Sequence, residues 1–290
     1  MDTGMIDAVI REWENETNDY SPVLADARFQ TLLSHAKDFQ RTDLDGLSYL
    51  NSLLHIDDID MRNHLAEIQR NLAIIRSVNL KQLAQNVQDY LPESALSGSE
   101  IRICPMIGIA GLALDDFVVI DPSPCPWFPA DGSDKETYLS TFILPVLRHE
   151  LHHVGYKRLH PVRNSAALKT CSELAADYAQ QFQMEGTAKL CEQCWRGESL
   201  DASEYQKLCD SFYQYYGWIQ EWLRTPGHPI EQKDWSAYDA LWSGDKPVYW
   251  LGRSICVLLI QRGMIHAVSD CVQIEPLRMM QMAADCIKQI

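Results

Sequence analysis

The stretch "VLRHELHHVGYKRLH" (residues 146–160) contains four histidines and the pattern H-E-x-x-H, formed by His149, Glu150 and His153. Positions i and i+4 of a helix lie on one face, so His149 and His153 can each offer a ring nitrogen to the same Zn²⁺. Glu150 lies about a quarter-turn from His149. From there its carboxylate can take a proton from a metal-activated water and pass it to a leaving amine. The stretch therefore predicts a zinc-binding helix with a general base beside the metal.

A solvated, histidine-rich helix face is the alternative explanation of this pattern. Four apolar residues between positions 146 and 154 argue against it, because they predict a mostly buried helix. Histidines and a glutamate in a buried helix need partners, and a metal ion provides one. His152 is expected to line the site or to be exposed, and His160 is expected at the surface beyond the helix end.

A catalytic zinc site of this kind needs a third protein ligand and keeps its fourth position open. The longer pattern H-E-x-x-H-x-x-G-x-x-H is absent, because Tyr156 and Leu159 occupy the positions of its glycine and its last histidine. A glutamate from the next helix is therefore expected to complete the site. Two candidates are present: Glu185 in "FQMEGTAKL" and Glu173 in "CSELAADYA".

Helical phase favours Glu185 as the third ligand. The apolar stripe of the second helix runs from Leu168 to Phe182, and at about 100° per residue Glu185 continues it. Glu173 falls on the opposite, polar face together with Asp177. Small residues after Glu185 would let two helices approach closely around a metal, whereas Asp177 could orient a ligand histidine if Glu173 were the ligand. Both glutamates stay open, with Glu185 preferred.

The H-E-x-H-H helix, the strand-like "FVVIDPSP" before it and the E-G-x-A segment after it together resemble the gluzincin clan of zinc metallopeptidases. Within this clan the sequence most closely resembles uncharacterised zinc-dependent peptidase families of bacteria. The resemblance implies that His149 and His153 are zinc ligands and that Glu150 is the catalytic base. It also implies Glu185 as the third ligand, whereas the spacing of Glu173 resembles that of thermolysin.

The resemblance covers roughly residues 100–260 and includes "PVYWLGRSICVLLIQRG", which is similar to the Tyr-x-x-Gly helix start of related peptidases. It implies that Tyr249 donates a hydrogen bond to the oxyanion that forms in amide hydrolysis. Packing of an aromatic ring at a helix start is the alternative role for Tyr249. His228, in "TPGHP", is a second candidate donor.

Hydrophobic spacing along the chain predicts an α+β, mostly helical fold with a zincin-like core. The expected parts are an N-terminal helical region (1–95) and a zincin-like metallopeptidase region (96–290), which holds a small sheet (100–121), two zinc helices (134–157 and 165–195) and a C-terminal helical lobe (203–290). The active site is expected between the sheet and the lobe.

Three local signals refine this expectation. Ser133 and Glu136 form a capping-box pattern at the start of the first zinc helix, and Pro145 predicts a kink or a restart within it. The segment "MIGIAGLALDD" could be an edge strand that pairs with an extended substrate. Its glycines would allow close approach of a ligand backbone, or they could simply mark turns of the sheet.

Composition limits the partners and the location of the protein. The formal net charge of −15 argues against nucleic acid or an anionic membrane surface as the main partner, because both require a basic footprint. No basic-then-apolar signal pattern and no apolar run long enough for a membrane span is present in the sequence. Nine cysteines, an odd number, do not form a disulfide framework, so a reducing cytoplasm is expected.

These observations predict a cytoplasmic zinc metallopeptidase that acts on a peptide or protein substrate. Two alternatives stay open. One is a catalytically inactive scaffold or binding protein that the zinc ion stabilises, and the other is a zinc hydrolase of a non-peptide amide. No oligomeric state is predicted from the sequence.

Overall fold

A computed structural model describes the whole chain of 290 residues apart from 16, 18, 41–44, 55–60, 104–109, 115, 124–133, 162–166 and 289–290. The described residues form a mostly helical α+β structure with one small sheet, which confirms the expected fold class. They divide into two compact units, Met1–Ala84 with Leu96–Val154 and Gln85–Ala95 with Gly155–Ile290. The boundary at residue 95 that the sequence suggests stays a prediction.

The sheet of the first unit has three strands, β1 (Glu100–Ile103), β2 (Gly111–Ala113) and β3 (Phe117–Ile120), in the order β1-β3-β2. β3 is the central strand; it pairs parallel with β1 and antiparallel with β2. All four residues of β3 are buried, as expected for a Val- and Ile-rich strand covered on both faces. The three strands lie within the expected span 100–121.

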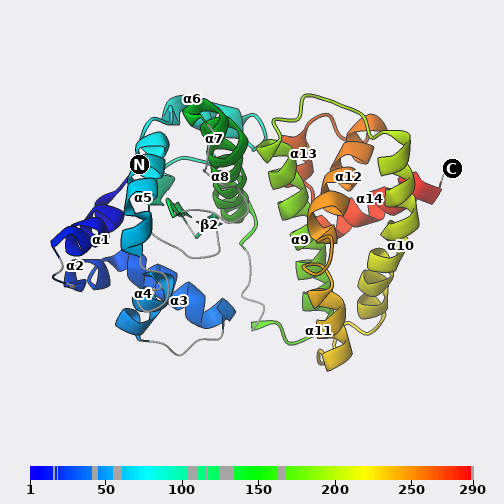
Figure 1. Ribbon diagram of the computed structural model, residues 1–290. Helices are drawn as coiled ribbons and strands as arrows, with labels where there is room; N and C mark the ends of the chain where they lie inside the picture. The colour runs from blue at the N-terminus through cyan, green and yellow to red at the C-terminus, as the bar shows by residue number, and fades with distance from the viewer. Residues whose placement is uncertain are drawn as a thin grey trace. The chain divides into compact units, whose positions relative to one another are not determined.

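Helices make up most of the first unit (Figure 1). They are α1 (Gly4–Asn15), α2 (Ser21–Leu24), α3 (Ala27–Gln40), α4 (Gly46–Leu54), α5 (Met61–Arg76), α6 (Leu80–Gln88), α7 (Lys135–Tyr138) and α8 (Leu144–Leu159). α6 and α8 begin in the first unit and end in the second. Residues 149–153, which form the H-E-x-x-H pattern, lie on α8.

The helix that carries H-E-x-x-H begins differently from the expectation. Asp134, and not Ser133, is the N-cap of α7: its side chain accepts a hydrogen bond of 2.8 Å from the backbone N–H of Thr137, and Ser133 lies outside the described residues. A π-helix over Leu139–Ile143 joins α7 to α8. Its wide turn comes directly before Pro145, whose ring would clash with the carbonyl of residue 141 in a regular α-helix. The irregularity expected at Pro145 is this π-turn.

The second unit is built around α9 (Cys171–Glu192), which packs most extensively against α12 (Figure 1). Its other helices are α10 (Ala202–Arg224), α11 (Gln232–Asp239), α12 (Pro247–Gln261), α13 (Val268–Gln273) and α14 (Pro276–Lys288). A capping box of Thr170 and Glu173 starts α9, so the second zinc helix is shorter at both ends than the expected range 165–195.

α9 and α12 come into backbone contact at two glycines. A Cβ atom added to Gly186 would lie 2.2 Å from the carbonyl carbon of Gly252, and one added to Gly252 would lie 2.2 Å from the carbonyl oxygen of Phe182. No side chain fits at either position, so the sequence requires glycine there. This contact fixes the turn of α9 that follows Glu185.

Among the described helices, none combines the length and the apolar character that crossing a lipid bilayer requires.

Candidate metal centre

His149 and His153 lie one turn apart on the same face of α8. Their Nε2 atoms are 2.9 Å apart, and the two rings meet edge to face with centroids 4.5 Å apart. Both side chains are buried, with exposed fractions of 8% and 6%. The i, i+4 spacing therefore brings the two ring nitrogens together, as the sequence predicted.

This arrangement fits a metal ion. Two imidazole nitrogens bound to one tetrahedral Zn²⁺ at 2.0–2.1 Å would lie about 3.3 Å apart, slightly more than the distance between the Nε2 atoms of His149 and His153. The rings need to separate by only a few tenths of an ångström to hold the ion. With the ion bound, both nitrogens would be unprotonated and would offer their lone pairs to the metal.

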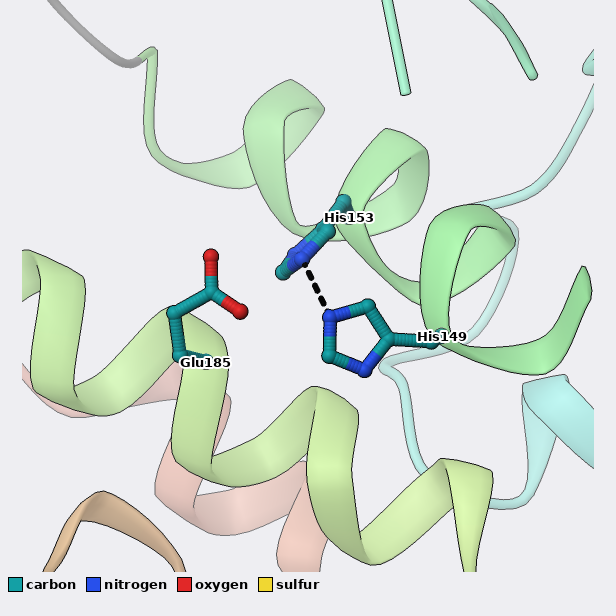
Figure 2. A group of neighbouring side chains, drawn as sticks. All are labelled: His149, His153 and Glu185. Atoms are coloured by element: carbon teal, nitrogen blue, oxygen red, sulfur yellow. Dashed lines mark hydrogen bonds between the residues drawn. The ribbon is translucent and has the colours of Figure 1, made fainter. Parts of the chain in front are cut away.

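Glu185 joins these two histidines. One ligand atom from each of His149, His153 and Glu185 lies within 4.8 Å of the others, and all three side chains are buried (Figure 2). Two neutral imidazoles and a carboxylate are a common donor set for zinc. Burial of a carboxylate in this setting is unfavourable unless a cation compensates its charge. The His-His-Glu group therefore fits zinc binding.

The placement of Glu185 follows from the burial of α9. Nearly every residue from Asp177 to Cys191 is buried, including Glu185 with an exposed fraction of 5%. A helix that is buried all round offers no polar face, so an acidic residue at its centre must point at a partner. Gly186, the next residue, makes the close contact with α12 described above.

Glu150, the expected general base, lies on α8 beside strand β2. A Cβ atom on Gly111 would be 3.0 Å from Cγ of Glu150 and 2.7 Å from Cγ1 of Val146. Gly111 was expected to admit a ligand backbone or to mark a turn, and the structure instead shows that it makes room for two side chains of α8. The Glu150 side chain is half-buried and therefore has access to solvent.

Glu173, the alternative third ligand, has a different place in the structure. Its Oε2 atom accepts hydrogen bonds from the backbone N–H groups of Lys169 (2.8 Å) and Thr170 (3.1 Å) at the start of α9. It also lines a cavity of about 430 Å³ in the second unit, together with His160 and Asp177. Sequence reasoning missed the capping role, although the signal was present: T-C-S-E over residues 170–173 has the S/T-x-x-E form of a capping box.

Two polar residues near the motif lie elsewhere than expected, and a third takes only one of its two expected positions. Asp177, assigned to a polar face, is buried, and its Oδ2 accepts a 2.6 Å hydrogen bond from the hydroxyl of Tyr238. Burial, with the nearby Asp177, raises the pKa of Tyr238 well above its usual value. His152, expected to line the site or to be exposed, is fully buried, which rules out only the exposed alternative. His160, expected at the surface, is half-buried, and its Nε2 lies 2.5 Å from the carbonyl oxygen of Val272.

The two candidate oxyanion donors both lie in the second unit. Tyr249 is in the first turn of α12, three residues before Gly252, and its ring meets that of Trp242 edge to face with centroids 6.2 Å apart. His228 is exposed, and its backbone oxygen accepts a hydrogen bond from the N–H of Cys171. The roles of Tyr249 and His228 in catalysis stay predictions.

Comparison with known proteins gives one result. Residues 36–282 match a family described as "Putative zinc dependent peptidase (DUF5700)". Neither the curated proteins nor the solved structures contain a match to the chain.

Proposed function

The chain belongs to this zinc-dependent peptidase family, and from that membership we propose that it hydrolyses peptide bonds in a peptide or protein substrate. The observation that carries the proposal is the buried group of His149, His153 and Glu185, with Glu150 next to His149 in the chain. This is the donor set of a hydrolytic zinc site with a carboxylate poised for proton transfer.

The zinc ion would be held by Nε2 of His149, Nε2 of His153 and a carboxylate oxygen of Glu185. A bound zinc ion supplies Lewis acidity: it lowers the pKa of a water molecule toward neutrality and polarises the carbonyl that is attacked. In this proposal Glu150 takes the proton from the attacking water and delivers it to the leaving amine. Its half-buried position keeps it in contact with solvent while α8 holds it in place.

The substrate is proposed to lie along strand β2. β2 pairs with β3 on one side only among the described strands, and Gly111 brings it against Glu150. An extended peptide that adds to the edge of β2 opposite β3 would place its main chain alongside Glu150, the proposed general base. Backbone hydrogen bonds of this kind position a peptide without selecting its sequence.

Tyr249 is proposed to donate a hydrogen bond to the oxyanion. Support comes from the contact between Gly186 and Gly252, which holds the first turns of α12 against the part of α9 that carries Glu185. Tyr249 lies one helical turn before Gly252 on α12, so its position depends on the same contact.

The cytoplasm is proposed as the location of the protein. Cys256 and Cys271 are both free thiols, and their sulfur atoms are 3.0 Å apart. Thiols this close would be expected to oxidise in a disulfide-forming compartment.

The test is metal analysis combined with hydrolysis of an unfolded protein such as casein. The parent chain should contain one zinc ion and cleave casein, and Glu150→Gln should keep the zinc and lose about 10²–10⁴-fold in rate. A parent chain without zinc, or a Glu150→Gln variant as active as the parent, would refute the proposal. Zinc that raises the melting temperature without any cleavage would indicate the inactive scaffold, and cleavage of small amides alone would indicate a non-peptide hydrolase.

A further inference from the structure

Tyr156 occupies the position that would hold glycine in the longer zinc motif, and here it is a buried hydrogen-bond donor. Its hydroxyl lies 2.5 Å from Oε1 of Gln183 on α9, and neither side chain has any exposed surface. Burial raises the pKa of Tyr156 well above its usual value, so the hydroxyl keeps its proton at neutral pH. The phenol is therefore the donor and the amide oxygen the acceptor.

Gln183 is held from the other side as well. Its Nε2 donates hydrogen bonds to the carbonyl oxygens of Cys271 (2.8 Å) and Ile274 (2.9 Å), at the end of α13. Both amide protons and the amide oxygen are thus used inside the protein. Rotation of the side chain would leave several buried polar groups without partners, which is unfavourable. The Gln183 side chain is therefore held in one orientation, and the hydroxyl of Tyr156 donates its hydrogen bond to this side chain.

The bond between Tyr156 and Gln183 lies close to two of the three candidate metal ligands along the chain. Tyr156 follows His153 by three residues on α8, and Gln183 precedes Glu185 by two residues on α9. Helices are rigid over a single turn, so a bond at this point limits sliding and rotation of the end of α8 relative to α9. Such movement would change the distance between the His153 nitrogen and the Glu185 carboxylate.

We propose that Tyr156 is a positioning residue of the zinc centre, which acts through Gln183 to set the register between the helix of His149 and His153 and the helix of Glu185. The inference rests on the proposed function, because it assumes that these three residues hold zinc. It assigns to Tyr156 no contact with the metal or the substrate. Its effect is on how well the three ligands are preorganised, and residues that orient ligands typically change metal affinity by about 10–100-fold.

Tyr178 provides a matched control on α9. It is a fully buried tyrosine like Tyr156, but its hydroxyl makes no hydrogen bond within the described part of the chain. Tyr156→Phe removes one hydroxyl and one hydrogen bond, whereas Tyr178→Phe removes one hydroxyl and no hydrogen bond. The two variants separate the bond to Gln183 from the general effect of a tyrosine-to-phenylalanine change in the core.

The experiment measures zinc affinity by competition with a chromophoric chelator, using the full metal-free chain and the two variants. Circular dichroism and urea unfolding first establish that each chain is folded. The absorption spectrum of bound Co²⁺ then reports the geometry of the ligands independently of any activity. A merely structural role of Tyr156 would change the unfolding curve without changing zinc affinity or the Co²⁺ spectrum of the folded protein.

We expect Tyr156→Phe to bind zinc about tenfold more weakly than the parent, with a changed Co²⁺ spectrum, and Tyr178→Phe to match the parent within about twofold. Parent-like affinity and spectrum in Tyr156→Phe would overturn the inference and leave the proposed function intact. Equal weakening in both variants, or loss of the fold in Tyr156→Phe, would show a general effect of core packing and would also overturn it. A parent chain that binds no zinc would instead refute the proposed function.

Discussion

Gly186 and Gly252 meet backbone to backbone, so that a methyl group on Gly186 would lie 2.2 Å from the carbonyl carbon of Gly252. The contact lies one residue after Glu185 on α9 and three residues after Tyr249 on α12. Two of the residues proposed to act in catalysis therefore depend on one pair of glycines for their placement.

Gly186→Ala should destabilise the protein because the added methyl group meets backbone atoms that cannot move aside. We expect a loss of about 3 kcal/mol or more in the free energy of unfolding, measured with urea. Gly217→Ala on α10 is the control, since nothing lies within 4 Å of a Cβ atom there. That change should stabilise by about 0.5–1 kcal/mol through helix propensity. Equal effects of the two substitutions would contradict the close contact.

Gly111→Ala should disturb Glu150, the proposed general base, through Val146. The added methyl group would lie 2.7 Å from Cγ1 of Val146 and 3.0 Å from Cγ of Glu150, so one of these side chains must shift. We expect a loss of about 1–3 kcal/mol in stability and a lower rate of hydrolysis. Adding Val146→Ala removes the closer of the two contacts and should recover part of both losses. Strict additivity in this double-mutant cycle would show that the added methyl group at position 111 and the Val146 side chain do not compete for space.

The two candidate third ligands on α9, Glu185 and Glu173, should respond in opposite ways to substitution. Glu185→Gln removes the carboxylate of the proposed metal site. Substituting a residue that only orients a ligand lowers metal affinity by up to about 100-fold, and we expect Glu185→Gln to lower zinc affinity by more than that. Glu173→Ala removes the acceptor for the N–H groups of Lys169 and Thr170, and we expect a loss of about 1 kcal/mol in stability with parent-like zinc affinity. Zinc titration and urea unfolding of both variants test this, and an exchange of the two results would make Glu173 the ligand.

Stability should fall at alkaline pH because of the buried tyrosines. Burial raises the pKa of Tyr178 above its usual value of 10.0, so the folded state keeps a proton that the unfolded state releases. This contribution is complete below about pH 10 and is lost as the pH rises further, at up to about 1.4 kcal/mol per pH unit for each such tyrosine. Tyr178→Phe should make the decline between pH 10 and 11.5 shallower. An unchanged slope would mean that Tyr178 titrates normally in the folded protein.

The sequence predicted well those features that depend on near neighbours in the chain. The i, i+4 spacing of His149 and His153 brings their ring nitrogens together, and Glu185, which helical phase favoured over Glu173, has a ligand atom within 4.8 Å of theirs. The role of Glu185 as the third ligand stays a prediction. For Asp177, however, helical phase predicted the wrong environment. It placed Asp177 on a polar face, but α9 is buried almost all round and Asp177 is bonded to Tyr238.

Features that depend on distant segments could not be predicted. The glycine that admits Val146 and Glu150 stands in another secondary-structure element, and the partner of Gly186 is 66 positions away, at Gly252. Local sequence patterns do not identify which distant segments come into contact, because many pairs of helices and strands have the same hydrophobic spacing. Tyr156 is a similar case: the sequence shows that it replaces a motif glycine, but Gln183 is identified as its partner only by the fold.

The π-helix over Leu139–Ile143 has a consequence for how the chain tolerates changes in length. Its backbone N–H at Leu144 bonds to the carbonyl of Leu139, five residues back, so this turn holds one residue more than an α-turn. Deleting one residue there would convert the turn to α-helix and would bring the ring of Pro145 against the carbonyl four residues before it. The same deletion between His149 and His153 would rotate one histidine by about 100° away from the other. The extra residue before the motif therefore accommodates Pro145, whereas the motif itself tolerates no change in length.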